Sequence, residues 1–241
     1  RDRLIIWRRI SQREGRELAS TGNTLMHAQA LALAHKYGIN PLELRDITDP
    51  SAPGTTYMES EIGTKYPFKC ITHNEKIAIT TIEAGEMANI EGFVFGITKL
   101  FAKQGISIDN IITQGTSIDI TVILPRDQAQ SEALLNRITQ LEPRLRELHI
   151  GDTTYKTDSV TFQEEARETV SLIGSELRTS STLTLAEAIL ILKKHHITVT
   201  STTSAESPYR ISFHVESGKG QEAVRTLHSH FIEKYNGSGK T

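Results

Sequence analysis

The chain carries one pattern twice, and this duplication limits the folds that are open to it. In residues 99–122 and again in residues 191–215, the end of an amphipathic helix is followed by a strand, a turn and a second strand. A helix that packs on an antiparallel strand pair is the core of a ferredoxin-like unit. The sequence therefore predicts an α+β protein with tandem ferredoxin-like βαββαβ domains. Two such units can sit side by side and share a small ligand.

Apolar spacing places the elements of the first copy. A stripe at helical spacing predicts a helix over 90–103, and Gly105 stands where that helix should end. Strands are expected over 106–113 and 117–124, because Gly115 between them is a hairpin signal.

The second copy repeats this order. A strand at 169–173 leads into a helix around 183–193, and strands at 197–202 and 209–215 follow. A last amphipathic helix is expected over 220–234.

The first 56 residues are organised differently. Helices over 11–19 and 24–36 and a strand-like run at 41–47 precede a stretch rich in Pro, Gly, Asp and Thr at 49–55. Such turn punctuation marks the expected domain boundary.

Composition excludes two classes of partner. The formal net charge is -2 and no block of like charge occurs, so no nucleic-acid partner is expected. No apolar run approaches the roughly 18 residues needed to cross a bilayer, so no membrane span is expected either. The only cysteine, Cys70, fits a reducing compartment, and we expect a cytoplasmic protein.

No metal site and no catalytic residue are predicted. Adjacent residues on a helix point about 100° apart, so His195 and His196 cannot both face one metal ion. The sequence contains neither a phosphate-binding Gly-rich loop nor a Gly-x-Ser-x-Gly motif.

The loop at 84–92 is the candidate ligand site. It leads into a helix N-terminus, where free backbone N–H groups favour a carboxylate. Asp109, in the neighbouring predicted strand, could accept a hydrogen bond from an ammonium group. One carboxylate-binding end and one ammonium-binding end would suit a free amino acid, whereas the alternative is an ordinary loop and a solvated Asp.

Short motifs along the chain resemble the regulatory half of aspartate kinases, from about residue 10 to residue 234. The most specific block is Gly92-Phe93 followed, after a gap, by Gly105-Ile106-Ser107-Ile108-Asp109. Other matching segments include Glu17-Leu18-Ala19-Ser20-Thr21-Gly22, Leu25-Met26-His27, Tyr37-Gly38-Ile39-Asn40-Pro41-Leu42, Asp49-Pro50 with Pro53-Gly54-Thr55, Ile71-Thr72-His73, Val170-Ser171-Leu172-Ile173-Gly174 and Leu227-His228-Ser229.

This resemblance implies tandem ACT domains after the last segment of an α/β amino-acid-kinase domain. The implied division is 1–56 for the end of the kinase domain, 57–67 for a linker, 68–163 for the first ACT domain, 164–235 for the second and 236–241 for a flexible tail.

The resemblance also implies a function. The parent enzyme would use ATP with Mg to phosphorylate the side-chain carboxylate of L-aspartate, in the pathway to lysine, threonine and methionine. This chain would be its allosteric, amino-acid-sensing part, inactive as a kinase by itself and without a cofactor of its own. Its effector would be lysine or threonine, and its ACT domains would self-associate into a homodimer.

By position, the resemblance carries the effector site onto eight residues. They are Met87, Ile90, Phe93, Val94, Ile108, Asp109, Thr113 and Gln114.

An alternative is a non-catalytic ACT-type amino-acid-binding module with a decayed kinase remnant. Thr24 stands where the family often has Lys, which favours this alternative, whereas the intact Pro53-Gly54-Thr55 boundary favours the enzyme. An RNA-binding βαββ domain is weaker, because Phe213 is the only stacking aromatic on the two strands concerned.

Overall fold

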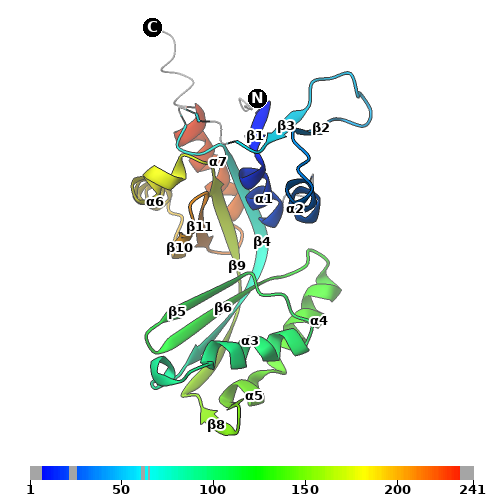
Figure 1. Ribbon diagram of the computed structural model, residues 1–241. Helices are drawn as coiled ribbons and strands as arrows, with labels where there is room; N and C mark the ends of the chain where they lie inside the picture. The colour runs from blue at the N-terminus through cyan, green and yellow to red at the C-terminus, as the bar shows by residue number, and fades with distance from the viewer. Residues whose placement is uncertain (1–6, 22–25, 61–62, 65, 234–241) are drawn as a thin grey trace. The chain divides into compact units, whose positions relative to one another are not determined.

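The computed structural model describes residues 7–21, 26–60, 63–64 and 66–233 (Figure 1). The predicted tail at 236–241 and Thr24 lie outside these described residues. The chain forms two compact units, one of residues 75–167 and one of residues 1–74 together with 168–241.

The unit of residues 75–167 contains the first copy of the repeat. Its sheet has the order β9-β4-β6-β5, and a separate hairpin pairs β7 with β8. The elements are β4 (Cys70–Glu83), η1 (Met87–Asn89), α3 (Phe93–Lys103), β5 (Asn110–Gln114), β6 (Ser117–Ile123), α4 (Gln128–Thr139), α5 (Glu142–Arg146), β7 (Glu147–Ile150), β8 (Thr153–Lys156) and β9 (Ser159–Ile173).

The core of this unit lies between its sheet and its helices. Ile118 and Ile120, both fully buried, face the helix side of β6 and share a core with Phe93, Ile97 and Phe101 of α3. This is the apolar stripe that the sequence predicted, so the helix and the hairpin are confirmed. The hairpin turn sits at a glycine with φ +54°, a backbone conformation that side chains rarely adopt.

The second unit combines the start of the chain with the second copy of the repeat. It contains the three-stranded sheet β1-β3-β2 and the β10-β11-β9-β4 end of the six-stranded sheet β10-β11-β9-β4-β6-β5. The elements not yet named are β1 (Arg9–Ser11), α1 (Gln12–Ser20), α2 (Ala28–Lys36), β2 (Leu42–Leu44), β3 (Thr55–Met58), α6 (Leu177–Lys194), β10 (Val199–Ser207), β11 (Arg210–Val215), α7 (Gly220–His228) and η2 (Ser229–Glu233).

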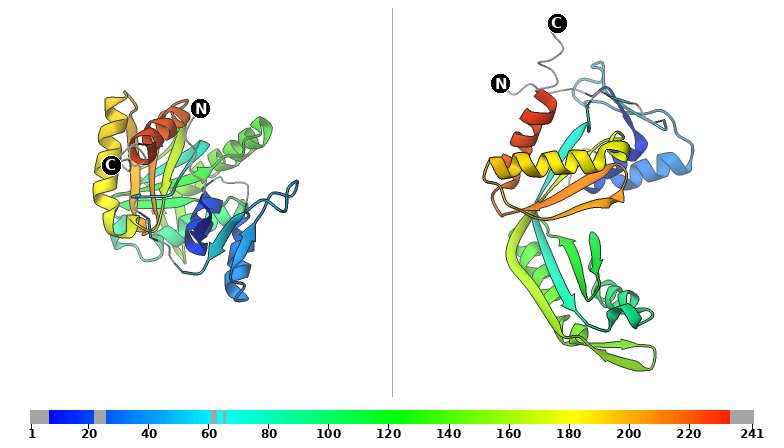
Figure 2. Two further views of the ribbon diagram at one scale, coloured as in Figure 1. Left: turned by 90° about the horizontal axis from the view of Figure 1, so that it is seen from above. Right: turned by 90° about the vertical axis from the view of Figure 1, so that its left-hand side faces the viewer.

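Two cores stabilise this unit. Helix α6 lies across β10 and β11 beside α7 (Figure 2), and Phe68, Phe213 and Phe231 are buried beneath these helices. A smaller core joins Leu18 and Tyr57 of the first segment to Ile173 at the end of β9. The N-terminal segment therefore packs directly on the second copy of the repeat.

The two compact units do not meet at the expected boundary between residues 163 and 164. Strand β9 continues without interruption through that point, and residues 68–74 pack with the second copy. Lys69 N–H donates to the Ile173 carbonyl at 2.8 Å, and Phe68 is completely buried in the second copy's core. The physical reason is that β4 and β9 are long enough for each to contribute to both units.

Candidate functional site

A pocket lies at the start of α3, open to solvent. Its volume is about 400 Å³. The residues that line it are Met87, Ile90, Gly92, Phe93, Val94, Phe95, Thr113 and Gly115.

The backbone at this end of α3 is arranged to meet an anion. Gly92 precedes the helix with φ +77°, and no side chain caps the helix there. The Phe93 N–H donates to the Ile90 carbonyl at 3.3 Å, whereas the N–H groups that follow it in the first turn have no partner within the helix and carry a partial positive charge. A carboxylate is therefore the group that this end of the pocket favours.

The pairing of β5 with β6 determines which residues form the second wall of the pocket. Thr113 pairs with the buried Ile118, so it lies on the helix side of the sheet. Gly115, in the hairpin turn, completes this wall.

Five of the eight residues predicted for the effector site line this pocket. They are Met87, Ile90, Phe93, Val94 and Thr113.

The other three predicted residues do not line it. Gln114 pairs with Ser117 one position along the strand, so it faces the opposite side of the sheet. Ile108 is half-buried against the core. Asp109 is exposed and lies four residues before Thr113, which is about 13 Å along an extended chain. The structure therefore does not bring the expected ammonium acceptor to the carboxylate end of this pocket.

Sequence reasoning missed Phe95, which lies outside the helix's apolar stripe and is 65% exposed. It also missed Gly115 as a lining residue, although a glycine in a hairpin turn was a usable signal, whereas Gly92 belongs to the predicted ligand loop at 84–92.

The corresponding turn in the second copy already holds a carboxylate. Between β9 and α6, the Ser175 N–H donates to Glu14 Oε1 at 2.8 Å. Glu14 comes from α1, and its other oxygen accepts hydrogen bonds from Ser11 N–H at 2.9 Å and from Lys69 Nζ at 2.8 Å. An internal side chain thus occupies the place where the first copy has an open pocket.

Glu14 is charged in this setting. Burial raises the pKa of its carboxyl, but the hydrogen bond from Lys69, the hydrogen bonds from Ser11 and Ser175 and the positive charge of Lys69 lower it by more. The net pKa lies below the usual value, so the group is a carboxylate at neutral pH.

The known proteins that are similar to this chain in sequence are aspartokinases. The chain is 26% identical to aspartokinase 2, chloroplastic, of Arabidopsis thaliana over 220 residues, which cover 91% of this chain and 38% of that protein. It is 22% identical to aspartokinase 3 of Bacillus subtilis over 223 residues, 92% of this chain and 46% of that protein. The chain is homologous to aspartokinases. No protein-family model matches it.

Solved aspartokinase structures share its fold. The aspartate kinase of Clostridium acetobutylicum superposes with a TM-score of 0.75 at 18% identity, over 95% of this chain and 50% of that one. Aspartokinase III of E. coli, in complex with lysine and aspartate, gives 0.69 at 20% identity, over 95% and 47%. The regulatory subunit of the Thermus thermophilus enzyme gives 0.52 at 18% identity, over 68% and 98%.

These likenesses confirm the predicted fold class of tandem ferredoxin-like ACT domains after the end of an α/β domain. The chain spans about two fifths of the length of the curated aspartokinases that it matches.

Two further findings concern the described residues. No three His, Cys, Asp or Glu side chains among them gather as metal ligands. Within the same residues, no helix is long and apolar enough to cross a membrane.

Proposed function

We propose that this chain is the regulatory part of an aspartate kinase and that the pocket at the start of α3 binds a free amino acid. The pocket itself carries the proposal, because it joins an uncapped helix N-terminus to an apolar wall. The N–H groups of α3 receive the ligand's carboxylate, and Met87 and Phe93 contact its side chain.

Lysine is the first candidate ligand and threonine the second. The E. coli relative is described in complex with lysine and aspartate, and this supports lysine for the present pocket. No carboxylate that could pair with the ligand's ammonium group is among the lining residues, of which only Thr113 carries a polar side chain. The pocket is open, so self-association through the ACT domains would let a second chain close it and supply a carboxylate.

The parent protein would transfer the γ-phosphoryl group of ATP, with Mg, to the side-chain carboxylate of aspartate. The E. coli relative described with aspartate and ADP supports this choice of substrate and nucleotide. The present chain by itself would lack kinase activity. It would act in the lysine, threonine and methionine pathway, and the single Cys70 favours the cytoplasm, although the Arabidopsis relatives are named chloroplastic.

Regulation would pass from the sensing unit to the kinase through the N-terminal segment. That segment is held to the second copy by Glu14 and by two contacts of Glu17, whose carboxylate accepts from Ser207 Oγ at 2.8 Å and lies 3.5 Å from Arg210 Nε. Any change in the second ACT domain therefore reaches residues that the resemblance assigns to the kinase domain.

The alternative of a non-catalytic module with a decayed kinase remnant is not favoured, because the similarity to aspartokinases covers 91% of the chain. An assay of the full parent protein distinguishes the two functions. Aspartate kinase activity that lysine inhibits would support the enzyme over the non-catalytic module.

Calorimetry of the chain with each of the twenty amino acids tests the proposed pocket. Val94→Glu would place a carboxylate beside the N–H groups of α3, at a residue 38% exposed, and should abolish binding. Leu183→Glu makes the same kind of change at a residue of α6 that is 77% exposed, and should leave binding intact. Binding that survives Val94→Glu would place the effector elsewhere.

A further inference from the structure

We propose that a second pocket in the unit of residues 75–167 binds a small organic phosphate. This pocket lies between α3, α5 and the β7–β8 hairpin and has a volume of about 560 Å³. The residues that line it are Gly96, Lys99, Leu100, Lys103, Arg144, Glu147, Leu148, His149 and Gly151.

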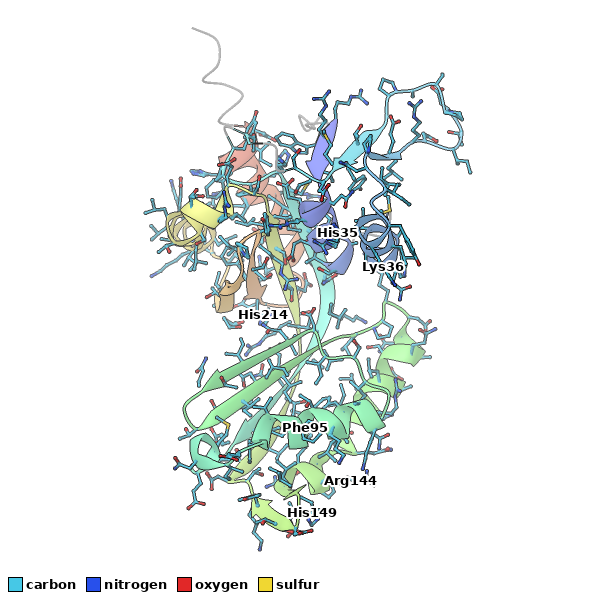
Figure 3. All side chains as sticks on the ribbon, in the orientation of Figure 1. His35, Lys36, Phe95, Arg144, His149 and His214 are labelled. Carbon is cyan, nitrogen blue, oxygen red and sulfur yellow. The ribbon has the colours of Figure 1, made fainter. Side chains whose placement is uncertain are left out.

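The lining is strongly cationic. Lys99 and Lys103 lie four residues apart on α3, so their side chains project from the same face of the helix. Arg144 belongs to α5 and His149 to β7, and Figure 3 shows both at this end of the unit. Three fixed positive charges face a single carboxylate, that of Glu147.

These charges are not neutralised within the described part of the chain. Arg146, two residues along α5, pairs with Glu142 at 2.8 Å. No carboxylate of the described residues lies within ion-pair distance of Lys99, Lys103 or Arg144. Concentrated positive charge without an internal partner attracts a multivalent anion.

The frame around the charges is well packed. A Cβ on Gly96 would lie 3.0 Å from Ile150 Cγ1, which shows how closely α3 approaches the hairpin. Lys99 Nζ sits 5.7 Å from the centre of the Phe95 ring, and His149 Nδ1 is hydrogen-bonded to Thr154 Oγ1 at 2.7 Å. These contacts hold two of the polar side chains in place.

The chemistry of the lining favours phosphate over a single carboxylate. A guanidinium binds phosphate oxygens in pairs, and two ammonium groups add point charges. The volume exceeds that of the pocket at the start of α3, and the apolar Leu100 and Leu148 offer a surface for the organic part of the ligand. The site would accept a phosphorylated metabolite.

Calorimetry and NMR titration of the chain with pyrophosphate test the proposal. Saturable binding is expected, and Arg144→Gln and Lys103→Gln should each weaken it about tenfold or more. Arg126→Gln is the matched control, because Arg126 is exposed in the same unit and does not line the pocket. Melting curves check that each variant folds.

Two outcomes would overturn the proposal. One is the absence of saturable pyrophosphate binding at millimolar concentration, and the other is an equal loss from Arg126→Gln, which would mean non-specific attraction. Val94→Glu should leave pyrophosphate binding unchanged, so failure of the amino-acid pocket and failure of this site are separable.

Discussion

Glu14 Oε2 lies 2.8 Å from Lys69 Nζ, with the two side chains only 1% and 2% exposed. The pair joins α1 to the residue just before β4, and the second oxygen of Glu14 reaches the turn before α6. One buried carboxylate thus connects α1 both to the residue before β4 and to the turn before α6.

Glu14→Gln should lower the free energy of unfolding by about 3 kcal/mol, because it removes the carboxylate charge that lies 2.8 Å from the buried Lys69 ammonium. Urea unfolding followed by the fluorescence of Trp7 is the measurement. Trp7 is the only tryptophan, and its Nε1–H donates to the Lys69 carbonyl at 2.7 Å.

Glu17→Gln is the matched control. Glu17 lies one turn further along α1, and its ion pair with Arg210 is 3.5 Å long and about one fifth exposed on each side, so about 1 kcal/mol or less is expected. Equal losses of unfolding free energy in the two variants would mean that the buried ion pair stabilises the fold no more than the partly exposed one.

Acid should remove the contribution of Glu14. Because its pKa is lowered in the folded chain, the carboxylate contributes stability that is fully present above the unfolded-state value of about 4.5. That stability is lost as the pH falls through the lower, folded-state pKa. The difference in melting temperature between the wild type and Glu14→Gln should shrink below pH 4.5, and a constant difference would contradict the assignment.

Cys70 should be unreactive in the folded chain. Burial, and after it the nearby negative charge of Glu14, raises the pKa of its thiol to about 12, although the positive charge of Lys69 acts in the opposite direction. Because the thiolate is the reactive form, a disulfide reagent should label native protein very slowly and urea-unfolded protein rapidly. Equally fast labelling of both would show that this part of the chain opens readily.

Amino-acid binding should strengthen association between two chains, if the pocket at the start of α3 is closed by a second copy. Linkage requires that the ligand prefer the associated form, and such couplings are typically about 1–3 kcal/mol. Sedimentation across a concentration series, with and without lysine, measures the shift, with Val94→Glu as the variant that should show none. An unchanged dimer constant for the wild type would leave regulation to rearrangement within a fixed assembly.

Local pattern was enough to predict the repeated helix–strand–strand order, whereas the eight effector-site residues came from the resemblance to aspartate kinases. The stripe from Phe93 to Phe101 and the glycine turn at 115 are short-range signals, since helix and hairpin geometry follow from neighbouring residues. The five of these residues that line the pocket all lie at or just before the helix start or on the adjoining strand. The resemblance to aspartate kinases supplied the rest of the fold class.

Only tertiary structure decided the features that depend on distant segments. Asp109 and Thr113 are close in sequence, but an extended chain carries them about 13 Å apart. Glu14, Lys69 and Ser175 come from three separate segments of the chain. The residue pattern around each of them does not predict that they are in contact. Long strands obscured the unit boundary for the same reason, because an uninterrupted β-pattern does not reveal where its pairing partners change.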